Sequence, residues 1–199
     1  SRQMGSVSSA MSKSTEKLSS GYKINRAADD AAGLSISEKM RSQIRGLNKA
    51  ASNAQDGISL VQVAEGALNE THSILQRMNE LATQAANDTN TSVDRTAIKQ
   101  EMNQLTSEID RIQSTTQFNS MNLLDGTFSS KALKLQVGAM SGQSISVSIA
   151  KMSASKLQLT TANMKVSSFS AAGTAMETIQ NAIKTVSETR SKLGAIQNR

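Results

Sequence analysis

The chain has 199 residues, of which 37% are hydrophobic and 2% aromatic, and it contains neither cysteine nor proline. The lack of cysteine excludes a disulfide framework and thiolate-based zinc sites, and the scarcity of aromatic residues argues against a large globular core. The net charge of +6 is unevenly distributed, since residues 51–130 are acidic and the segments on either side are basic. Such blocks suit self-association or intramolecular pairing at least as well as binding along nucleic-acid phosphates.

The first segment, residues 1–18, is predicted to be helical but carries only a thin apolar pattern, with Val7, Met11 and Leu18. It is polar and serine-rich, and it lacks the continuous apolar stretch of a secretory signal peptide. No run of 18 apolar residues occurs in the chain, so we expect no membrane-spanning helix. Residues 19–29 contain turn-forming residues and connect this segment to the next helix.

A long helix is predicted from about residue 30 to residue 86, because apolar residues recur there at spacings of three and four. An unbroken helix of this length would extend roughly 80 Å, far beyond an ordinary globular helix. It therefore predicts a rod or a bundle. The apolar positions are Met40, Ile44, Leu47, Ala51, Ala54, Ile58, Val61, Ala64, Leu68, Thr71, Leu75, Met78, Ala82 and Ala85.

A second helix is predicted over about 94–116, after a polar loop at residues 87–92. Its apolar residues follow a heptad spacing, and the short connection favours antiparallel packing against the first long helix. The heptad positions are Ile98, Met102, Leu105, Ile109 and Ile112.

The periodicity changes to two over about 117–150, which predicts β-hairpins with one apolar face. Asp125-Gly126 is a strong turn signal in this region. Residues 151–173 give no firm pattern, and a C-terminal helix is predicted over about 174–198. The predicted fold is therefore mainly α: an elongated bundle of long antiparallel helices with a small β-hairpin region.

Several ordered motifs closely resemble those of bacterial flagellins. They are the segments at residues 18–25, 27–34, 53–59, 65–70, 116–119 and 193–199. The resemblance implies that residues 30–199 form the flagellin domain called D1, with 19–29 as a spoke-like linker and 1–18 as a remnant of the terminal D0 helix. It also implies that the terminal D0 helices are largely missing, that the outer variable domains are absent and that this chain polymerises poorly.

The function implied by the resemblance is that of a structural subunit of the flagellar filament, located outside the cell. Its partners would be other flagellin subunits and the flagellar export apparatus. Arg26, Asp29 and Asp30 are candidates for subunit contacts, although helix capping is the alternative for these residues and the one we favour.

Many flagellins are ligands of the innate immune receptor Toll-like receptor 5, and the resemblance places the corresponding contacts on the D1 helices. Arg77, Leu81 and Glu101 match the principal contact residues, and Gln76 and Gln84 lie in the same stretch. Arg77 could offer planar donors, Leu81 an apolar anchor and Glu101 a charged acceptor. The alternative is that the two charged residues are merely solvated and that Leu81 packs in the bundle.

Other functions find less support in the sequence. His72 is the only histidine and has no metal-ligand or triad spacing, so we expect no enzyme, no cofactor and no metal site. A hook–filament junction protein is an alternative, because it shares terminal sequences with flagellins. A basic helical bundle that binds nucleic acid is an alternative of another class, but the acidic middle third and the lack of stacking aromatics argue against it.

Overall fold

The computed structural model describes residues 2–26 and 30–199 of the chain. Helices account for most of it, and the strands are short, which confirms the predicted mainly α fold. The elements are α1 (Arg2–Ser20), α2 (Ala31–Ala85), α3 (Ser92–Thr115), β1 (Gln117–Phe118), β2 (Met121–Asn122), α4 (Thr127–Ser130), β3 (Leu133–Gln136), β4 (Ser144–Val147) and α5 (Phe169–Asn198).

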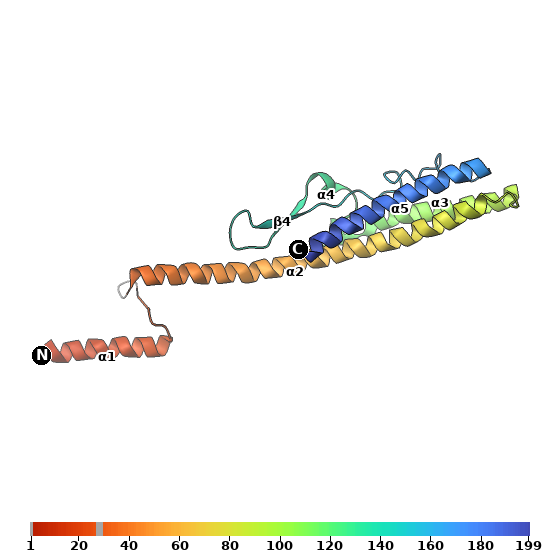
Figure 1. Ribbon diagram of the computed structural model, residues 1–199. Coiled ribbons are helices and arrows are strands. Elements are labelled where there is room, and N and C mark those ends of the chain that lie inside the picture. Colours follow the sequence, from red (N-terminus) through yellow and green to blue (C-terminus); the bar gives the residue numbers. More distant parts are fainter. Residues whose placement is uncertain (1, 27–29) are drawn as a thin grey trace.

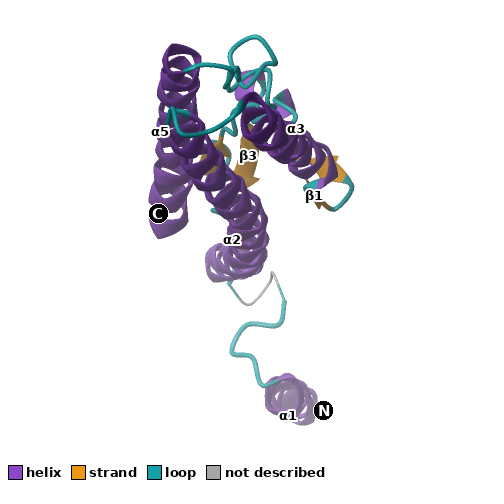
Figure 2. Ribbon diagram, turned by 90° about the vertical axis from the view of Figure 1, so that its right-hand side faces the viewer, coloured by secondary structure: helices purple, strands orange, loops and turns teal. Residues whose placement is uncertain are grey.

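The long helix α2 organises the molecule. Both α3 and α5 pack against its C-terminal half and flank it on two sides (Figures 1 and 2). The β3–β4 hairpin lies beyond the end of α5, over the middle of α2, while α1 lies apart from the bundle (Figure 1). In the described part of the chain, no helix carries a stretch long and apolar enough to cross a bilayer.

The core is a narrow seam along the C-terminal half of α2. Leu68, Leu75 and Met78 of α2 are fully buried, as are Met102 of α3 and Ile179 of α5. Alanines at the α2–α5 contact are also buried and keep the two helices close, because a methyl group leaves little space between backbones. The predicted heptad of the second helix therefore faces this seam.

The N-terminal half of α2 departs from the predicted packing. Met40, Ile44 and Leu47 belong to the predicted apolar stripe, yet each is more than half exposed, as is Ile36 one turn earlier. The reason is that α3 and α5 reach only the C-terminal half of α2, so within the described residues no helix packs on this part of the stripe (Figure 1). The prediction that these residues form part of a packed seam is wrong for this structure.

The β region contains two small antiparallel ribbons rather than one series of hairpins. In β3–β4, Leu133 pairs with Val147 and Leu135 with Ile145, as the alternation predicts. The Asp125-Gly126 turn does not join two strands: Gly126 has a φ of 95° and stands before the short helix α4. A tight turn with positive φ at Asn119 and Ser120 joins β1 to β2 instead.

The segment between β4 and α5, for which the sequence gives no pattern, covers the bundle with non-periodic structure. It buries Met152, Leu159 and Met164 against the helices, although it forms only turns. The Asp110 side chain of α3 anchors it, since its Oδ1 accepts a hydrogen bond from the backbone N–H of Ala154 at 2.8 Å. Helix α5 then begins at Phe169, five residues before the predicted start.

Candidate functional site

The predicted contact residues Arg77 and Glu101 lie side by side on the surface formed by α2 and α3. Their sequence neighbours Met78 and Met102 are fully buried in the seam between these two helices. Successive helical residues point about 100° apart, so the side chains next to the seam residues stand at its rim. The antiparallel α2–α3 turn brings the two rims together.

An ion-pair cluster fixes the Arg77 guanidinium. Its Nε and Nη2 donate to Oε1 of Glu101 at 3.1 Å and 2.9 Å, and its Nη1 donates to Oε2 of Glu80 at 3.1 Å. The hydrogen bond to Glu101, and secondarily that to Glu80, raises the pKa of Arg77 above its ordinary value. The side chains of all three residues are about half exposed or more, so the cluster stabilises the fold only weakly but holds three charges in a defined arrangement.

Gln76 and Gln84 are exposed on the same helix, and each makes a local contact. The Nε2 of Gln76 lies 3.1 Å from Nε2 of His72, the only histidine. The backbone carbonyl of Gln84 accepts a hydrogen bond from Nδ2 of Asn90 at 2.6 Å, which ties the end of α2 to the following loop. Both amide side chains are therefore placed on an accessible helix surface.

Leu81 does not fit the predicted role of an apolar surface anchor. Its side chain is 2% exposed and belongs to the core of the bundle. Three residues separate it from Met78, nearly one helical turn, so it points toward the same seam. The prediction of an accessible apolar contact at this position is wrong, and the alternative, that Leu81 packs in the bundle, is confirmed.

The residues predicted for subunit contacts lie at the start of α2 and in the segment before it. Asp30 is the N-cap of α2, and its Oδ1 accepts a hydrogen bond from the backbone N–H of Gly33 at 2.9 Å. Arg26 is exposed and its Nε donates to Oε1 of Glu16 at 3.0 Å. Asp29 lies outside the described residues. The structure thus gives Asp30 a capping role.

Glu80 also belongs to the Arg77 ion-pair cluster but is not among the residues predicted from the sequence. It stands three positions after Arg77 on α2, a spacing at which opposite charges meet on a helix surface, so this signal was available. No cluster of three or more His, Asp or Glu side chains suited to a metal ion occurs within residues 2–26 and 30–199. The surface therefore carries fixed charges and accessible amides beside the α2–α3 seam.

Comparisons with known proteins agree with this fold. The family model "Bacterial flagellin N-terminal helical region" matches residues 1–129. A flagellin of Halalkalibacterium halodurans is 52% identical over 198 residues, which cover 100% of this chain and 72% of that protein. A flagellin of Clostridium tyrobutyricum is 69% identical over 126 residues, but these cover 63% of this chain and only 33% of that longer protein.

A solved structure leads to the same family. The crystal structure of Bacillus cereus flagellin superposes with a TM-score of 0.63 at 32% identity, over 73% of this chain and 82% of that one. Because the family model matches well over half of the residues and a relative is 52% identical over the full length, this chain belongs to the flagellin family.

Proposed function

We propose that this protein is a structural subunit of the bacterial flagellar filament and works outside the cell. The full-length similarity to the Halalkalibacterium flagellin carries this proposal. A protein of Treponema phagedenis named "Flagellar filament 33 kDa core protein" is 56% identical over 128 residues. These relatives favour a filament subunit over a hook–filament junction protein. The flagellar export apparatus is then the expected partner before assembly.

The shape of the molecule supports assembly into a polymer. A bundle built along one long helix offers long side faces to neighbouring copies. The exposed apolar residues of α2, including Met40, Ile44 and Leu47, are left uncovered by the parts of the chain that the structure describes, and they suit lateral contact. We assign residues 30–199 to the D1 domain, 19–29 to a spoke-like linker and 1–18 to the D0 helix. Arg26 lies in that linker as a candidate contact.

A chimera tests the filament role without depending on the chain ends. In the gene for the Halalkalibacterium flagellin, the region aligned with residues 31–199 is replaced by that of this chain. We expect long filaments in electron micrographs and swimming cells. A chimera that is exported and folded but forms no filaments would contradict the proposal, and short stubs alone would favour the junction protein. A chimera with Ile109→Asp serves as the control without filaments, because it disrupts the bundle.

We further propose that the α2–α3 surface binds Toll-like receptor 5 through Arg77 and Glu101, with Gln76 and Gln84 at its edge. Support comes from the residue match, from the exposure of these side chains and from the ion pair that fixes them before binding. A fixed guanidinium loses little side-chain entropy on binding, which favours a hot spot. Leu81 takes no part in this contact, because it is buried.

Binding to the purified receptor ectodomain tests this surface. We expect Arg77→Ala and Glu101→Ala each to weaken binding by about tenfold or more, as removal of a hot-spot residue does. Arg111→Ala is the matched control, because Arg111 is equally an exposed arginine paired with a glutamate, Glu108, but lies elsewhere on α3. Equal binding by all three variants, or no binding by the folded parent, would contradict the receptor assignment and leave the filament proposal intact.

A further inference from the structure

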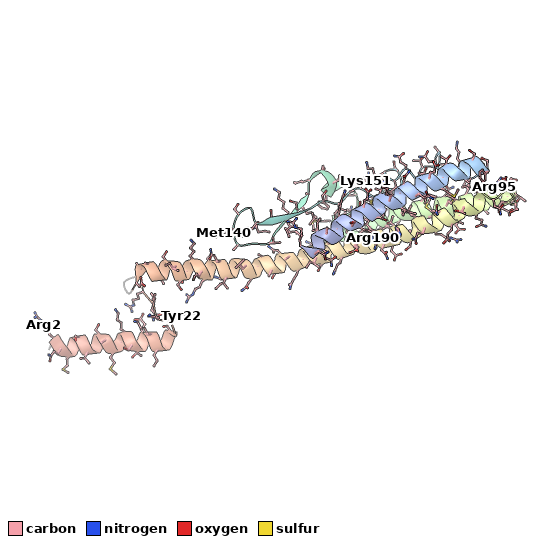
Figure 3. The ribbon with its side chains drawn as sticks, viewed as in Figure 1. Arg2, Tyr22, Arg95, Met140, Lys151 and Arg190 are labelled. Atoms are coloured by element: carbon pink, nitrogen blue, oxygen red, sulfur yellow. The ribbon has the colours of Figure 1, made fainter. Side chains whose placement is uncertain are left out.

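A basic cavity lies at the end of the bundle remote from α1, where Figure 3 shows Arg95. It opens between the first turns of α3 and the segment that precedes α5, and its volume is about 490 Å³. Its lining shares no residue with the Arg77 cluster. The lining residues are Ser92, Arg95, Thr96, Lys99, Lys165, Val166 and Ser167.

The three cations around this cavity differ in how they are held. The Arg95 side chain is only 16% exposed; its Nε donates to the carbonyl of Ala85 at 3.1 Å and its Nη2 pairs with Asp88 at 3.0 Å. Arg95 therefore has a structural role, since these contacts tie the loop between α2 and α3 to the start of α3. Lys99 and Lys165 have no comparable structural contact, since no carboxylate among residues 2–26 and 30–199 forms an ion pair with either lysine.

The charge of the cavity calls for an anion. Lys99 and Lys165 line it without an ion-pair partner, next to Arg95, whose charge is already paired with Asp88, and none of the lining residues is acidic. Like charges gathered around one hollow repel one another, and an anion placed among them converts that repulsion into attraction. The N-terminal end of α3 is already capped by Thr91 and Asp94, so the two lysines supply the attraction for an anion.

The remaining lining groups point to a sugar rather than to a bare ion. Ser92, Thr96 and Ser167 contribute hydroxyl groups, which both donate and accept hydrogen bonds. The Thr96 hydroxyl donates to the carbonyl of Ser92 at 2.8 Å, so its oxygen is left to accept. A volume of about 490 Å³ lies in the range of small-molecule sites and exceeds the needs of one inorganic ion.

We propose that this cavity binds an acidic saccharide, a sugar whose sulfate or carboxylate group lies between Lys99 and Lys165 while its ring hydroxyls meet the serine and threonine side chains. The inference goes beyond the filament and receptor roles and depends on neither. Val166, which is buried beside the cavity, fixes the segment that carries Lys165 and Ser167.

Isothermal titration calorimetry on the full chain at about 50 mM salt tests the site, since low salt keeps charge interactions measurable. The probes are a heparin-derived sulfated disaccharide, the same disaccharide without sulfate, which keeps its uronic carboxylate, and inorganic sulfate. The variant is Lys99→Gln with Lys165→Gln, which removes both unpaired charges but leaves Arg95 in its structural contacts. Lys134→Gln, an exposed lysine on β3, is the matched control.

We expect the sulfated disaccharide to bind the parent and the control alike, and the double variant to bind it at least tenfold more weakly. Thermal unfolding at the parent's temperature checks that the double variant is folded. Tighter binding of the sulfated than of the desulfated disaccharide assigns the anion as sulfate, and equal binding of the two assigns it as carboxylate. The proposal is overturned if the double variant binds as the parent does, if no sugar binds, or if inorganic sulfate binds as tightly as the sugars.

Discussion

The two halves of α2 carry the same apolar periodicity, but only the C-terminal half buries its apolar residues. In the C-terminal half, Leu68 and Leu75 are fully buried beneath α3 and α5. In the N-terminal half, Ile44 is 58% and Leu47 is 53% exposed. A periodic apolar stripe thus shows which face of a helix can be buried, while the length of the neighbouring helices decides whether the same chain buries it.

The two halves also differ in what their side chains contribute to stability. Full burial of a leucine or isoleucine contributes about 1.5–3 kcal/mol, whereas an exposed side chain contributes little. The N-terminal half therefore depends on backbone hydrogen bonds and helix propensity, and we expect it to open locally more readily than the packed half. If neighbouring subunits bury the apolar stripe of the N-terminal half in a filament, the difference in local stability between the two halves of α2 would disappear.

The largest expected effect comes from placing the same charge in each region. Ile109→Asp puts an unpaired carboxylate into the seam between α3 and α2, where Ile109 is fully buried, and should lower the free energy of unfolding by about 3–5 kcal/mol. Ile44→Asp should lower it by less than about 1 kcal/mol, through helix propensity alone. Urea denaturation followed by circular dichroism measures both. Similar losses would show that the exposed half is packed in solution.

Most of the helical architecture follows from the sequence, because periodicity and caps are local signals. The long helix predicted over 30–86 is observed at Ala31–Ala85, and the second, predicted over 94–116, at Ser92–Thr115. The β ribbons were harder to locate. Asp125-Gly126 is a typical hairpin turn sequence. In the structure, however, the Asp125 carboxylate accepts hydrogen bonds from the backbone N–H and the hydroxyl of Thr127, where the short helix α4 begins. The covering segment 151–168 has no period, since each buried residue there meets a different part of the bundle.

The Arg77–Glu101 contact of the candidate site can be predicted from the antiparallel pairing of α2 and α3. The burial of Leu81 cannot, because it depends on how α2 is rotated about its own axis relative to its neighbours. Arg77 and Glu101 were selected by resemblance, and their contact follows from the α2–α3 pairing. Leu81 adjoins Ala82 of the predicted stripe, so whether it lies inside or at the rim depends on where α3 and α5 sit. Periodicity alone does not give that angle.

Replacing either of two glycines in α2 by alanine should change the stability of the protein, with opposite signs at the two positions. At Gly57, an added Cβ would meet Cδ1 of Leu135 from the hairpin, whereas at Gly66 nothing lies within 4 Å. Gly57→Ala gains the same helix propensity as Gly66→Ala but loses more through overpacking, so its net cost should be about 0.5–1 kcal/mol. Gly66→Ala should stabilise the protein by about 0.5–1 kcal/mol through helix propensity. Melting temperatures that rise for both variants would show that the hairpin does not contact α2 as the structure places it.

The caps of α2 and α3 sharpen the comparison further. Thr91 caps α3 within the packed region, and Thr91→Ala should reduce global stability by about 1 kcal/mol. Asp30 caps the uncovered end of α2, so Asp30→Ala should fray its first turns with almost no change in the global transition. Amide hydrogen exchange separates the two effects. In Asp30→Ala we expect faster exchange only in residues 31–40. A loss of protection throughout the protein would contradict the interpretation that the N-terminal end of α2 opens independently of the bundle.

The smallest expected effect is a pH dependence at the α3 cap. The side-chain and backbone groups of Thr91 donate hydrogen bonds to the Asp94 carboxylate, which lowers the pKa of Asp94 below its ordinary value of 3.8. Because the folded-state pKa is the lower one, this stabilisation is complete above the unfolded pKa and is lost as the pH falls through the folded pKa.

Asp94→Asn keeps an acceptor at this position but cannot ionise, so it should melt below the parent at pH 7. The difference in melting temperature should narrow only below about pH 4, where the unfolded chain begins to bind its proton first. Comparing the two proteins at each pH cancels the titration of other carboxylates, including Glu108 and Asp125, whose pKa values are also lowered by hydrogen bonds. A difference that stays constant down to pH 2 would mean that the cap acts through hydrogen-bond geometry alone, without the charge.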